Sequence, residues 1–216
     1  MSNYELILFD LDGTLTDPCI GITNSVAFAL EKFDIYIKDK TQLVKFIGPP
    51  LIESFAEIYN LSVQQARQAI VFYREYFAEK GIFENSVYDG VEDLLKSLVK
   101  AGKRLCVATS KPEVYAKKIL NHFNLSQYFE YIAGATMDET RIKKQDVIEY
   151  ALEKCNFADR TKAVMVGDRK HDILGAKMCS VDSIGVLFGY GSLEELQTAG
   201  ATYIAKTVGD IEKFIL

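Results

Sequence analysis

The chain has 216 residues, of which 49% are hydrophobic, and its 25 basic and 30 acidic side chains give a formal net charge of −5. This composition is typical of a soluble globular protein with one large domain, or with a core domain that carries a smaller insert. The negative net charge excludes a general attraction to nucleic acid or to an anionic membrane surface.

The sequence shows no signal for membrane insertion, export or disulfide formation. No apolar run approaches the roughly 20 residues that span a bilayer, and no basic segment precedes a long apolar stretch at the N-terminus. The cysteines are scattered and form no Cys-x-x-Cys pair: Cys19, Cys106, Cys155 and Cys179. We therefore expect reduced thiols and a cytoplasmic protein.

The first predicted strand, residues 6–9, is followed by the segment DLDGT, which places Asp10 and Asp12 two positions apart. In a strand, side chains at positions i and i+2 lie on the same face, so the two carboxylates would point the same way. Burial of two like charges so close together is unfavourable unless a cation neutralises them. The pair therefore indicates either a solvated loop or a cation site.

A long stretch of helical texture follows, from Gly21 to about Val87, with no convincing strand. At roughly 65 residues it is far longer than an ordinary connection between two strands. We therefore expect a core made of residues 1–17 and 88–216, and a small α-helical cap, residues 18–87, inserted after the first strand. An insert at this place would lie over the strand ends, where it could act as a lid.

The remainder of the chain alternates between short apolar runs and amphipathic segments. Continuous runs rich in β-branched residues predict buried strands at 104–108, 131–133, 163–166, 183–187 and 202–204. Helical spacing and end signals predict helices at 90–101, 112–123, 145–154 and 192–199. This alternation predicts an α/β fold with a doubly wound, Rossmann-like parallel sheet and with functional groups at the carboxyl ends of its strands.

Hydroxyl and lysine side chains stand close to the ends of these predicted elements. Thr109 and Ser110 follow a strand, and Pro112 begins a helix whose N-terminus is a natural anion site. Lys143 and Lys144 stand at the start of another helix, where a cation is unfavourable unless it pairs with a bound anion. The pattern predicts an anion site at this edge of the sheet.

Two more aspartates follow the strand predicted at 163–166. Asp168 comes directly after Gly167, and Asp172 stands one helical turn further on. Because the strand ends of a parallel sheet can converge, Asp10, Asp12 and Asp168 could hold Mg²⁺, which prefers oxygen ligands. The cation would make the paired carboxylates tolerable.

A phosphate bound by Thr109 and Lys143 would then lie against Asp10. A carboxylate is a competent nucleophile toward phosphorus, and its attack gives an aspartyl-phosphate. Asp12 can protonate the leaving alcohol and afterwards take a proton from the water that attacks the acyl-phosphate. The residues thus predict hydrolysis of a phosphomonoester.

These motifs make the chain similar to the haloacid dehalogenase superfamily of hydrolases, close to its phosphoglycolate-phosphatase-like branch. DLDGTLTD matches the first motif of that superfamily, Thr109 the second, a lysine of IKKQ the third and GDRKHD the fourth. The resemblance implies Asp10 as nucleophile, Asp12 as acid/base, and Mg²⁺ held by Asp10, Asp168 and the backbone carbonyl of Asp12. It also implies that Asp172 is a supporting carboxylate that orients a metal-bound water or the lysine.

The resemblance leaves two choices in the phosphate site. Lys143 is preferred over Lys144, because its spacing to Asp168 fits the usual motif spacing of related hydrolases. Ser110 stands where the phosphoglycolate-phosphatase branch often has asparagine, which weakens the case for phosphoglycolate as the substrate.

The helical insert corresponds to the α-helical cap of the superfamily. FIGPPL, residues 46–51, resembles the cap loop that meets the substrate, so Gly48 is a candidate substrate contact. Arg74, in FYREYF, is a candidate to reach the far end of the substrate. For both residues the alternative is a structural role, as a tight turn and as a surface arginine.

We therefore expect a monomeric enzyme that hydrolyses a small phosphorylated metabolite, such as phosphoglycolate or a nucleoside monophosphate, with Mg²⁺ as cofactor and with no nucleic-acid or membrane partner. One alternative on the same fold is a sugar-phosphate mutase, which returns the phosphoryl group to the substrate. An alternative of another class is a non-catalytic phospho-acceptor signalling domain. Such modules are about half this length and lack a large helical insert.

Overall fold

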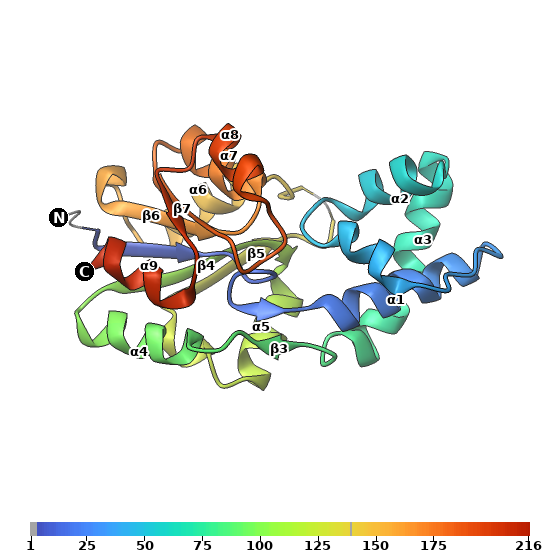
Figure 1. Ribbon diagram of the computed structural model, residues 1–216, viewed down its shortest axis with the longest axis horizontal. Helices are drawn as coiled ribbons and strands as arrows, with labels where there is room; N and C mark the ends of the chain where they lie inside the picture. Colours follow the sequence, from blue (N-terminus) through green and yellow to red (C-terminus); the bar gives the residue numbers. More distant parts are fainter. Residues whose placement is uncertain (1–3, 139) are drawn as a thin grey trace. The chain divides into compact units, whose positions relative to one another are not determined.

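The computed structural model describes residues 4–138 and 140–216, which fold as two compact units (Figure 1). The sheet unit joins the N-terminal segment up to Asp17 to Val87–Leu216, and the helical unit is Pro18–Ser86. The second boundary falls one residue before the predicted one. Within the described residues, no helix combines the length and the hydropathy that crossing a membrane requires.

The sheet unit contains a six-stranded sheet in which every pair of neighbours is parallel (Figure 1). The strand order is β5-β4-β1-β6-β7-β8. The strands are β1 (Leu6–Phe9), β4 (Arg104–Pro112), β5 (Tyr131–Ala135), β6 (Ala163–Gly167), β7 (Asp182–Val186) and β8 (Tyr203–Ala205). The predicted doubly wound α/β fold is confirmed. All six predicted strands are present, with ends that differ by a few residues at most.

The sheet reverses its winding direction at β1, which lies between β4 and β6. The chain adds β4 and β5 on one side of β1 and then crosses to add β6, β7 and β8 on the other. Phe9 lies opposite both Val107 and Val166, so the carboxyl ends of these three central strands meet at one edge. Such a switch point is where open α/β sheets bind their ligands.

Helices cover both faces of the sheet (Figure 1). On one face, α6 and α7 bury a cluster with the strand residues Leu8, Cys106 and Met165. In Figure 1, α4, α5 and α9 lie on the opposite side. The helices are α4 (Val91–Lys100), α5 (Glu113–His122), α6 (Lys144–Lys154), α7 (Lys170–Met178), α8 (Leu193–Ala199) and α9 (Val208–Ile215). The predicted helices did not include α7 and α9. The capping partner of Thr207 in α9 is Asp210, not the glutamate or glutamine of the usual capping-box pattern.

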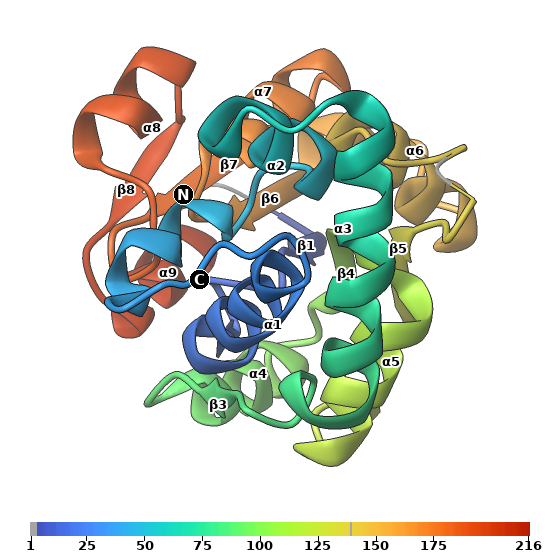
Figure 2. The ribbon, with the colours of Figure 1, turned by 90° about the vertical axis from the view of Figure 1, so that its right-hand side faces the viewer.

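The helical unit is built from α1 (Cys19–Glu31), α2 (Leu51–Tyr59) and α3 (Val63–Tyr76), and α1 packs on α3 (Figure 2). A 3₁₀ helix, Lys40–Phe46, precedes α2, and a π-helical turn, Phe77–Gly81, follows α3. A capping box starts α3, with Ser62 and Gln65 bonded reciprocally. The short strands β2 (Thr16–Asp17) and β3 (Ser86–Val87) pair with each other.

Candidate active site

The segment after β1 turns sharply at the edge of the sheet. The Asp10 N–H donates to the Val166 carbonyl over 2.9 Å, which extends the β1–β6 pairing to the first aspartate. Gly13 has φ +83°, and a Cβ atom there would lie 2.2 Å from Asp168 Oδ2. Only glycine allows both this backbone conformation and this close approach. The turn thereby brings the DLDGT backbone against Asp168.

Lys144, the first residue of α6, reaches into this turn with its side chain. Its Nζ lies 2.9 Å from Asp10 Oδ1 and 2.7 Å from Asp172 Oδ1, and it donates to the Ala108 carbonyl over 3.1 Å. Its side chain is only 4% exposed. Lys144 therefore joins the ends of β1 and β4 to the aspartate of α7.

The preference for Lys143 as the phosphate-site lysine does not fit the structure. Lys143 is the N-cap residue of α6 and is exposed, whereas the adjacent Lys144 is buried against the carboxylates. Adjacent residues at a helix start point in different directions, so only one of the two can reach the sheet edge. The motif spacing used in the sequence argument did not resolve a shift of one residue.

Thr109 and Ser110 lie in β4, where its pairing with β5 is irregular. The register shifts between Thr109 and Pro112, which leaves Ser110 and Lys111 in a bulge at the strand end. Thr109 is buried and its Oγ1 accepts a hydrogen bond from the Lys111 N–H over 3.2 Å. Ser110 is half-buried in the same bulge. The bulge directs polar groups to the edge that carries Asp10.

A second buried lysine, Lys111, pairs with the other aspartate of the first motif. Its Nζ lies 2.9 Å from Asp12 Oδ2, with side-chain exposures of 5% and 14%. Each lysine therefore pairs with one aspartate of the first motif, Lys144 with Asp10 and Lys111 with Asp12.

Asp168 and Asp172 are both fully buried. Asp168 Oδ2 accepts from the Tyr190 N–H over 2.8 Å, and Asp172 Oδ2 accepts from the Arg169 N–H over 3.0 Å. Carboxylate oxygens of Asp10, Asp168 and Asp172 all lie within 4.8 Å of one another. The structure thus gathers four aspartates and two lysines into one cluster, which we call the carboxylate cluster: Asp10, Asp12, Lys111, Lys144, Asp168 and Asp172.

Burial dominates the electrostatics of the carboxylate cluster. It raises the pKa of Asp12, an effect that the charge of Lys111 opposes. It also raises the pKa of Asp168, together with repulsion from Asp172 and Asp10, and raises the pKa of Asp172 to about 6. For Lys144, burial alone would lower the pKa, but the attraction of Asp10 and Asp172 outweighs it and the pKa is raised. The protein alone stabilises these carboxylates poorly in their charged form.

The donor set of the cluster fits a divalent cation. Four carboxylates and two ammonium groups leave a formal charge of −2 when all are ionised. Asp168 Oδ1 is buried and has no hydrogen-bond partner among the described residues. Oxygen donors with excess negative charge suit a hard cation such as Mg²⁺. The buried aspartates can therefore hold a divalent metal ion.

Two predicted substrate contacts lie in the helical unit. Gly48, with φ +103°, is exposed in the segment before α2. Arg74 is half-buried in the last turn of α3. They lie within one unit of the chain and the carboxylate cluster within the other, so their contact with substrate stays a prediction.

Lys111 and Tyr190 contact the aspartates of the site but were not predicted from the sequence. Lys111 follows Thr109 and Ser110 in the sequence, a pattern that is also typical of an ordinary polar turn. Tyr190 acts on Asp168 through its main chain. The paired glycines around it, in GYG, were the available signal, since they allow close approach of a backbone.

Arg141 connects the loop before α6 to its surroundings. Its Nε donates to the Gly134 carbonyl over 3.0 Å, its Nη2 lies 3.4 Å from Glu113 Oε2, and its guanidinium stacks 3.6 Å from the centre of the Tyr150 ring. Glu113 begins α5, directly after the Thr109 bulge. Arg141 thus holds the segment that leads to Lys144 against the helix that follows Thr109.

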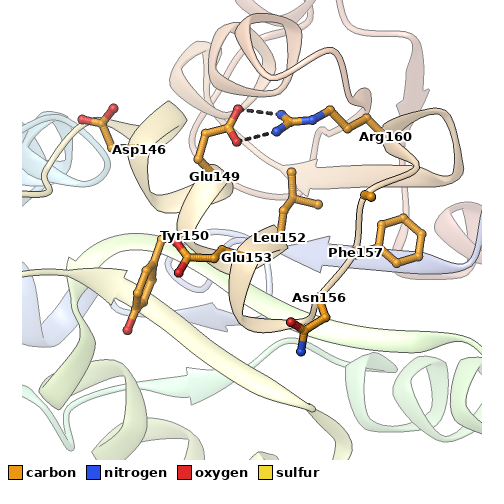
Figure 3. A pocket seen from close by; sticks show the side chains of 9 residues that line it. Asp146, Glu149, Tyr150, Leu152, Glu153, Asn156, Phe157 and Arg160 are labelled. Carbon is orange, nitrogen blue, oxygen red and sulfur yellow. Dashed lines mark hydrogen bonds and ion pairs between the residues drawn. The ribbon is translucent and has the colours of Figure 1, made fainter.

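A surface pocket on the outer side of α6 is distinct from the carboxylate cluster (Figure 3). Glu149 and Arg160 pair across it at 2.6 Å, and Tyr150 and Phe157 add aromatic surface. None of the described residues that line this pocket belongs to the carboxylate cluster. The chemistry of the cluster therefore does not extend into it.

Comparison with known proteins finds a matching family model and similar named proteins. A family model described as haloacid dehalogenase-like hydrolase matches residues 7–186, which include every residue of the carboxylate cluster. The 5′-nucleotidase of Pseudomonas aeruginosa is 45% identical over 200 residues, 93% of this chain and 90% of that protein. Tyrosine-protein kinase PtkA of Mycobacterium tuberculosis is 38% identical over 97% of this chain and 72% of that protein.

A solved structure extends the similarity to the fold. The crystal structure of a predicted phosphatase from Clostridium acetobutylicum is 51% identical in sequence and superposes with a TM-score of 0.95. The match covers 98% of each chain. The fold is therefore shared with that protein.

Proposed function

Because the chain belongs to the haloacid dehalogenase-like hydrolases, as its motifs predicted, and is a phosphoric monoester hydrolase, we propose that it cleaves small phosphomonoesters through a phosphoryl-Asp10 intermediate, with 5′-nucleotides as the first substrate class. The observation that carries the mechanism is the contact of Lys144 with Asp10, 2.9 Å, inside a cluster of four aspartates. A nucleophile, a proton carrier and a cation site then lie at one edge of the sheet.

Two half-reactions follow from these residues. In the first, an oxygen of Asp10 attacks phosphorus, the bond from phosphorus to the substrate oxygen breaks, and Asp12 gives that oxygen its proton. In the second, water attacks phosphorus, the bond to Asp10 breaks, and Asp12 accepts a proton from the water. The Asp10 carboxylate and protonated Asp12 are thus restored, with inorganic phosphate as product.

The proposal assigns phosphate binding to the bulge of β4 and to Lys144. Thr109 and Ser110 supply hydroxyl and N–H groups at the strand end, and the Lys144 ammonium offsets negative charge on the transferring group. Lys144 replaces Lys143 in this role because, of these two residues, only Lys144 lies at the carboxylates of Asp10 and Asp172. Asp172 acts as the supporting carboxylate that holds Lys144 in place.

Mg²⁺ is the cation proposed for the cluster, held by Asp10, Asp168 and the Asp12 carbonyl. When bound, it polarises the phosphoryl oxygens and neutralises charge that builds up on them. The buried and unpartnered Oδ1 of Asp168 supports this assignment.

The first substrate class comes from the 45% identity with the Pseudomonas aeruginosa 5′-nucleotidase. Phosphoglycolate is the runner-up, and the Ser110 position argues against it. The helical unit is proposed as the cap that selects among substrates, with Gly48 and Arg74 as its candidate contacts.

The proposal is tested with a panel of nucleoside 5′-monophosphates, phosphoglycolate, hexose phosphates and p-nitrophenyl phosphate, with and without Mg²⁺. We expect Mg²⁺-dependent release of inorganic phosphate, with the highest kcat/KM for a nucleotide, and no turnover by Asp10→Asn. Turnover by folded Asp10→Asn at the wild-type rate would contradict the nucleophile, and preference for a non-nucleotide would contradict the substrate class.

Two competing outcomes can be read from the same preparation. A hexose phosphate converted to its positional isomer, with little free phosphate, would indicate a mutase. Because the mycobacterial relative is named a tyrosine kinase, incubation with γ-labelled ATP forms a useful control. We expect no transfer of the label to protein tyrosine, and label retained on tyrosine would favour the kinase activity.

A further inference from the structure

The loop between β7 and α8, residues 187–192, fits its backbone closely around Asp168. The Tyr190 N–H donates to Asp168 Oδ2 over 2.8 Å. A Cβ atom at Gly189 would lie 2.4 Å from the Asp168 Cβ and 2.6 Å from its Oδ2. A side chain at that position would therefore push the loop away from the carboxylate.

The side chain of Tyr190 fixes the same loop at a second point. Its phenol donates to Asp17 Oδ1, and Tyr88 forms a further hydrogen bond with the Tyr190 side chain. Asp17 ends β2, a few residues after Asp12, and all of these residues lie in the sheet unit. Tyr190 therefore links the segment of the first motif to the carboxylate of the fourth.

The two oxygens of Asp168 have different surroundings. Oδ2 is engaged by the Tyr190 N–H, whereas Oδ1 is buried with no hydrogen-bond partner in the described part of the chain. A carboxylate held through one oxygen presents the other in a fixed direction. The direction of Oδ1 is thus set by where the loop places the Tyr190 N–H.

We propose that Tyr190 is a positioning residue of the metal site, which orients Asp168 through its N–H and keeps that N–H in place through the phenol bond to Asp17. The inference rests on the proposed function for the presence of a divalent cation in the carboxylate cluster. Without the phenol bond the loop samples more conformations, and ordering it when metal binds lowers the affinity.

The test is calorimetric titration of Mg²⁺ into metal-free protein, with no substrate present. For Tyr190→Phe, which keeps the N–H and loses only the phenol oxygen, we expect the Kd for Mg²⁺ to rise about three- to ten-fold. Asp17→Ala should give a similar rise, and Asp17→Asn, which retains an acceptor oxygen, a smaller one. The double variant Tyr190→Phe/Asp17→Ala should bind no more weakly than the weaker single variant, because each single variant already removes the Tyr190–Asp17 bond.

Tyr4→Phe is the matched control. The Tyr4 phenol donates to Asp182 Oδ2 over 2.6 Å in the same unit, so this variant loses a similar tyrosine–aspartate bond away from Asp168. Its Kd for Mg²⁺ should stay within about two-fold of wild type. An unchanged Kd in folded Tyr190→Phe would overturn the inference, as would equal weakening in Tyr4→Phe. Should Tyr190→Phe not fold, the Asp17→Ala and Asp17→Asn pair decides the question in the same way.

Because calorimetry reads metal binding alone, its result does not depend on which phosphomonoester is cleaved. Wild-type protein that binds Mg²⁺ but releases no phosphate from the substrate panel would contradict the proposed function. The Tyr190 comparison would still be measured on that protein, so the two failures are distinguishable.

Discussion

Lys111 and Asp12 form a buried ion pair, with 2.9 Å between Nζ and Oδ2. The other oxygen of Asp12, Oδ1, has no hydrogen-bond partner among the described residues. The lysine therefore fixes the carboxyl group through one oxygen, and the second is the oxygen that the proposed proton transfer would use. A proton carrier needs such a defined position within hydrogen-bond reach of the leaving group.

Replacement of Lys111 by Met should impair substrates with poor leaving groups most. Met keeps much of the apolar volume but cannot hold the Asp12 carboxylate. We expect kcat for a nucleoside monophosphate to fall about 10- to 100-fold, because protonation of the leaving alcohol is lost in part. The p-nitrophenolate leaving group needs little protonation, so kcat for p-nitrophenyl phosphate should fall less. Equal losses on both substrates would contradict the positioning of Asp12 by Lys111.

The two adjacent lysines at the start of α6 should behave very differently. Lys144→Met removes the ammonium group at Asp10 and should lower kcat about 10²- to 10³-fold at saturating Mg²⁺. Lys143→Met alters an exposed N-cap residue and should change kcat by less than about three-fold. Steady-state kinetics, with circular dichroism as the check on folding, measures both. A large loss in Lys143→Met with little change in Lys144→Met would restore the assignment made from motif spacing.

The sequence predicted the sheet well because its strands are continuous apolar runs and its helices have clear end signals. It also predicted which strand ends carry the polar side chains, since Asp10, Thr109 and Asp168 directly follow or end apolar segments. These features depend on local pattern and on the general geometry of parallel sheets.

Contacts that depend on one residue of register, or on the main chain, could not be predicted. The choice between Lys143 and Lys144 turns on where α6 begins, and helix ends are the least certain part of a pattern. Tyr190 holds Asp168 through its N–H, which every residue except proline has. Lys111 reaches Asp12 only because a bulge shifts the end of β4, and the apolar pattern of the strand does not show that bulge.

Neutralising one buried aspartate should stabilise the metal-free protein. The folded-state pKa of Asp168 is raised by burial, so its ionised form opposes folding at neutral pH. Asp168→Asn removes that cost, and we expect the Tm in EDTA to rise by about 2–4 °C. Mg²⁺ should raise the Tm of wild type but no longer that of the variant. A lower Tm in EDTA, or an intact Mg²⁺ effect in the variant, would contradict this account of the cluster.

The raised pKa values of the buried aspartates also determine how the stability of the metal-free protein depends on pH. A raised folded-state pKa means that the destabilising charge disappears as pH falls through that pKa, and the pKa of Asp172 is raised to about 6. Metal-free wild type should therefore become more stable as pH falls from 8 through 6 toward 5, as followed by thermal denaturation in EDTA. The Tm of Asp168→Asn should depend less on pH. A Tm of wild type that decreases steadily as the pH is lowered over this range would contradict poorly compensated carboxylates.

Removing the Arg141 clamp should cost both stability and activity. Arg141→Ala loses the bonds to Gly134 and Glu113 and the stacking on Tyr150, and we expect a loss of about 1–2 kcal/mol in the free energy of unfolding. Because the loop leads to Lys144, kcat/KM should also fall about five- to ten-fold. Urea denaturation and steady-state kinetics measure the two effects.

Arg160→Ala is the control for the Arg141 variant. Arg160 follows α6 in the chain and pairs with Glu149 of α6 at 2.6 Å, at the surface pocket of Figure 3. Its replacement therefore removes an arginine that does not hold the Lys144 loop. Its kcat/KM should stay within about two-fold of wild type. A similar loss of kcat/KM in both variants would show that general stability, and not the clamp, is responsible.

A crystal structure of the protein with Mg²⁺ and beryllofluoride, a mimic of a phosphoryl group bound to a carboxylate, tests the central claim most directly. We predict beryllium bonded to a carboxylate oxygen of Asp10, Mg²⁺ bound by Asp10 and Asp168, and Lys144 in contact with the fluoride atoms. Beryllofluoride bound elsewhere, or an Asp10 carboxylate that stays unmodified while Mg²⁺ occupies the cluster, would contradict Asp10 as the nucleophile.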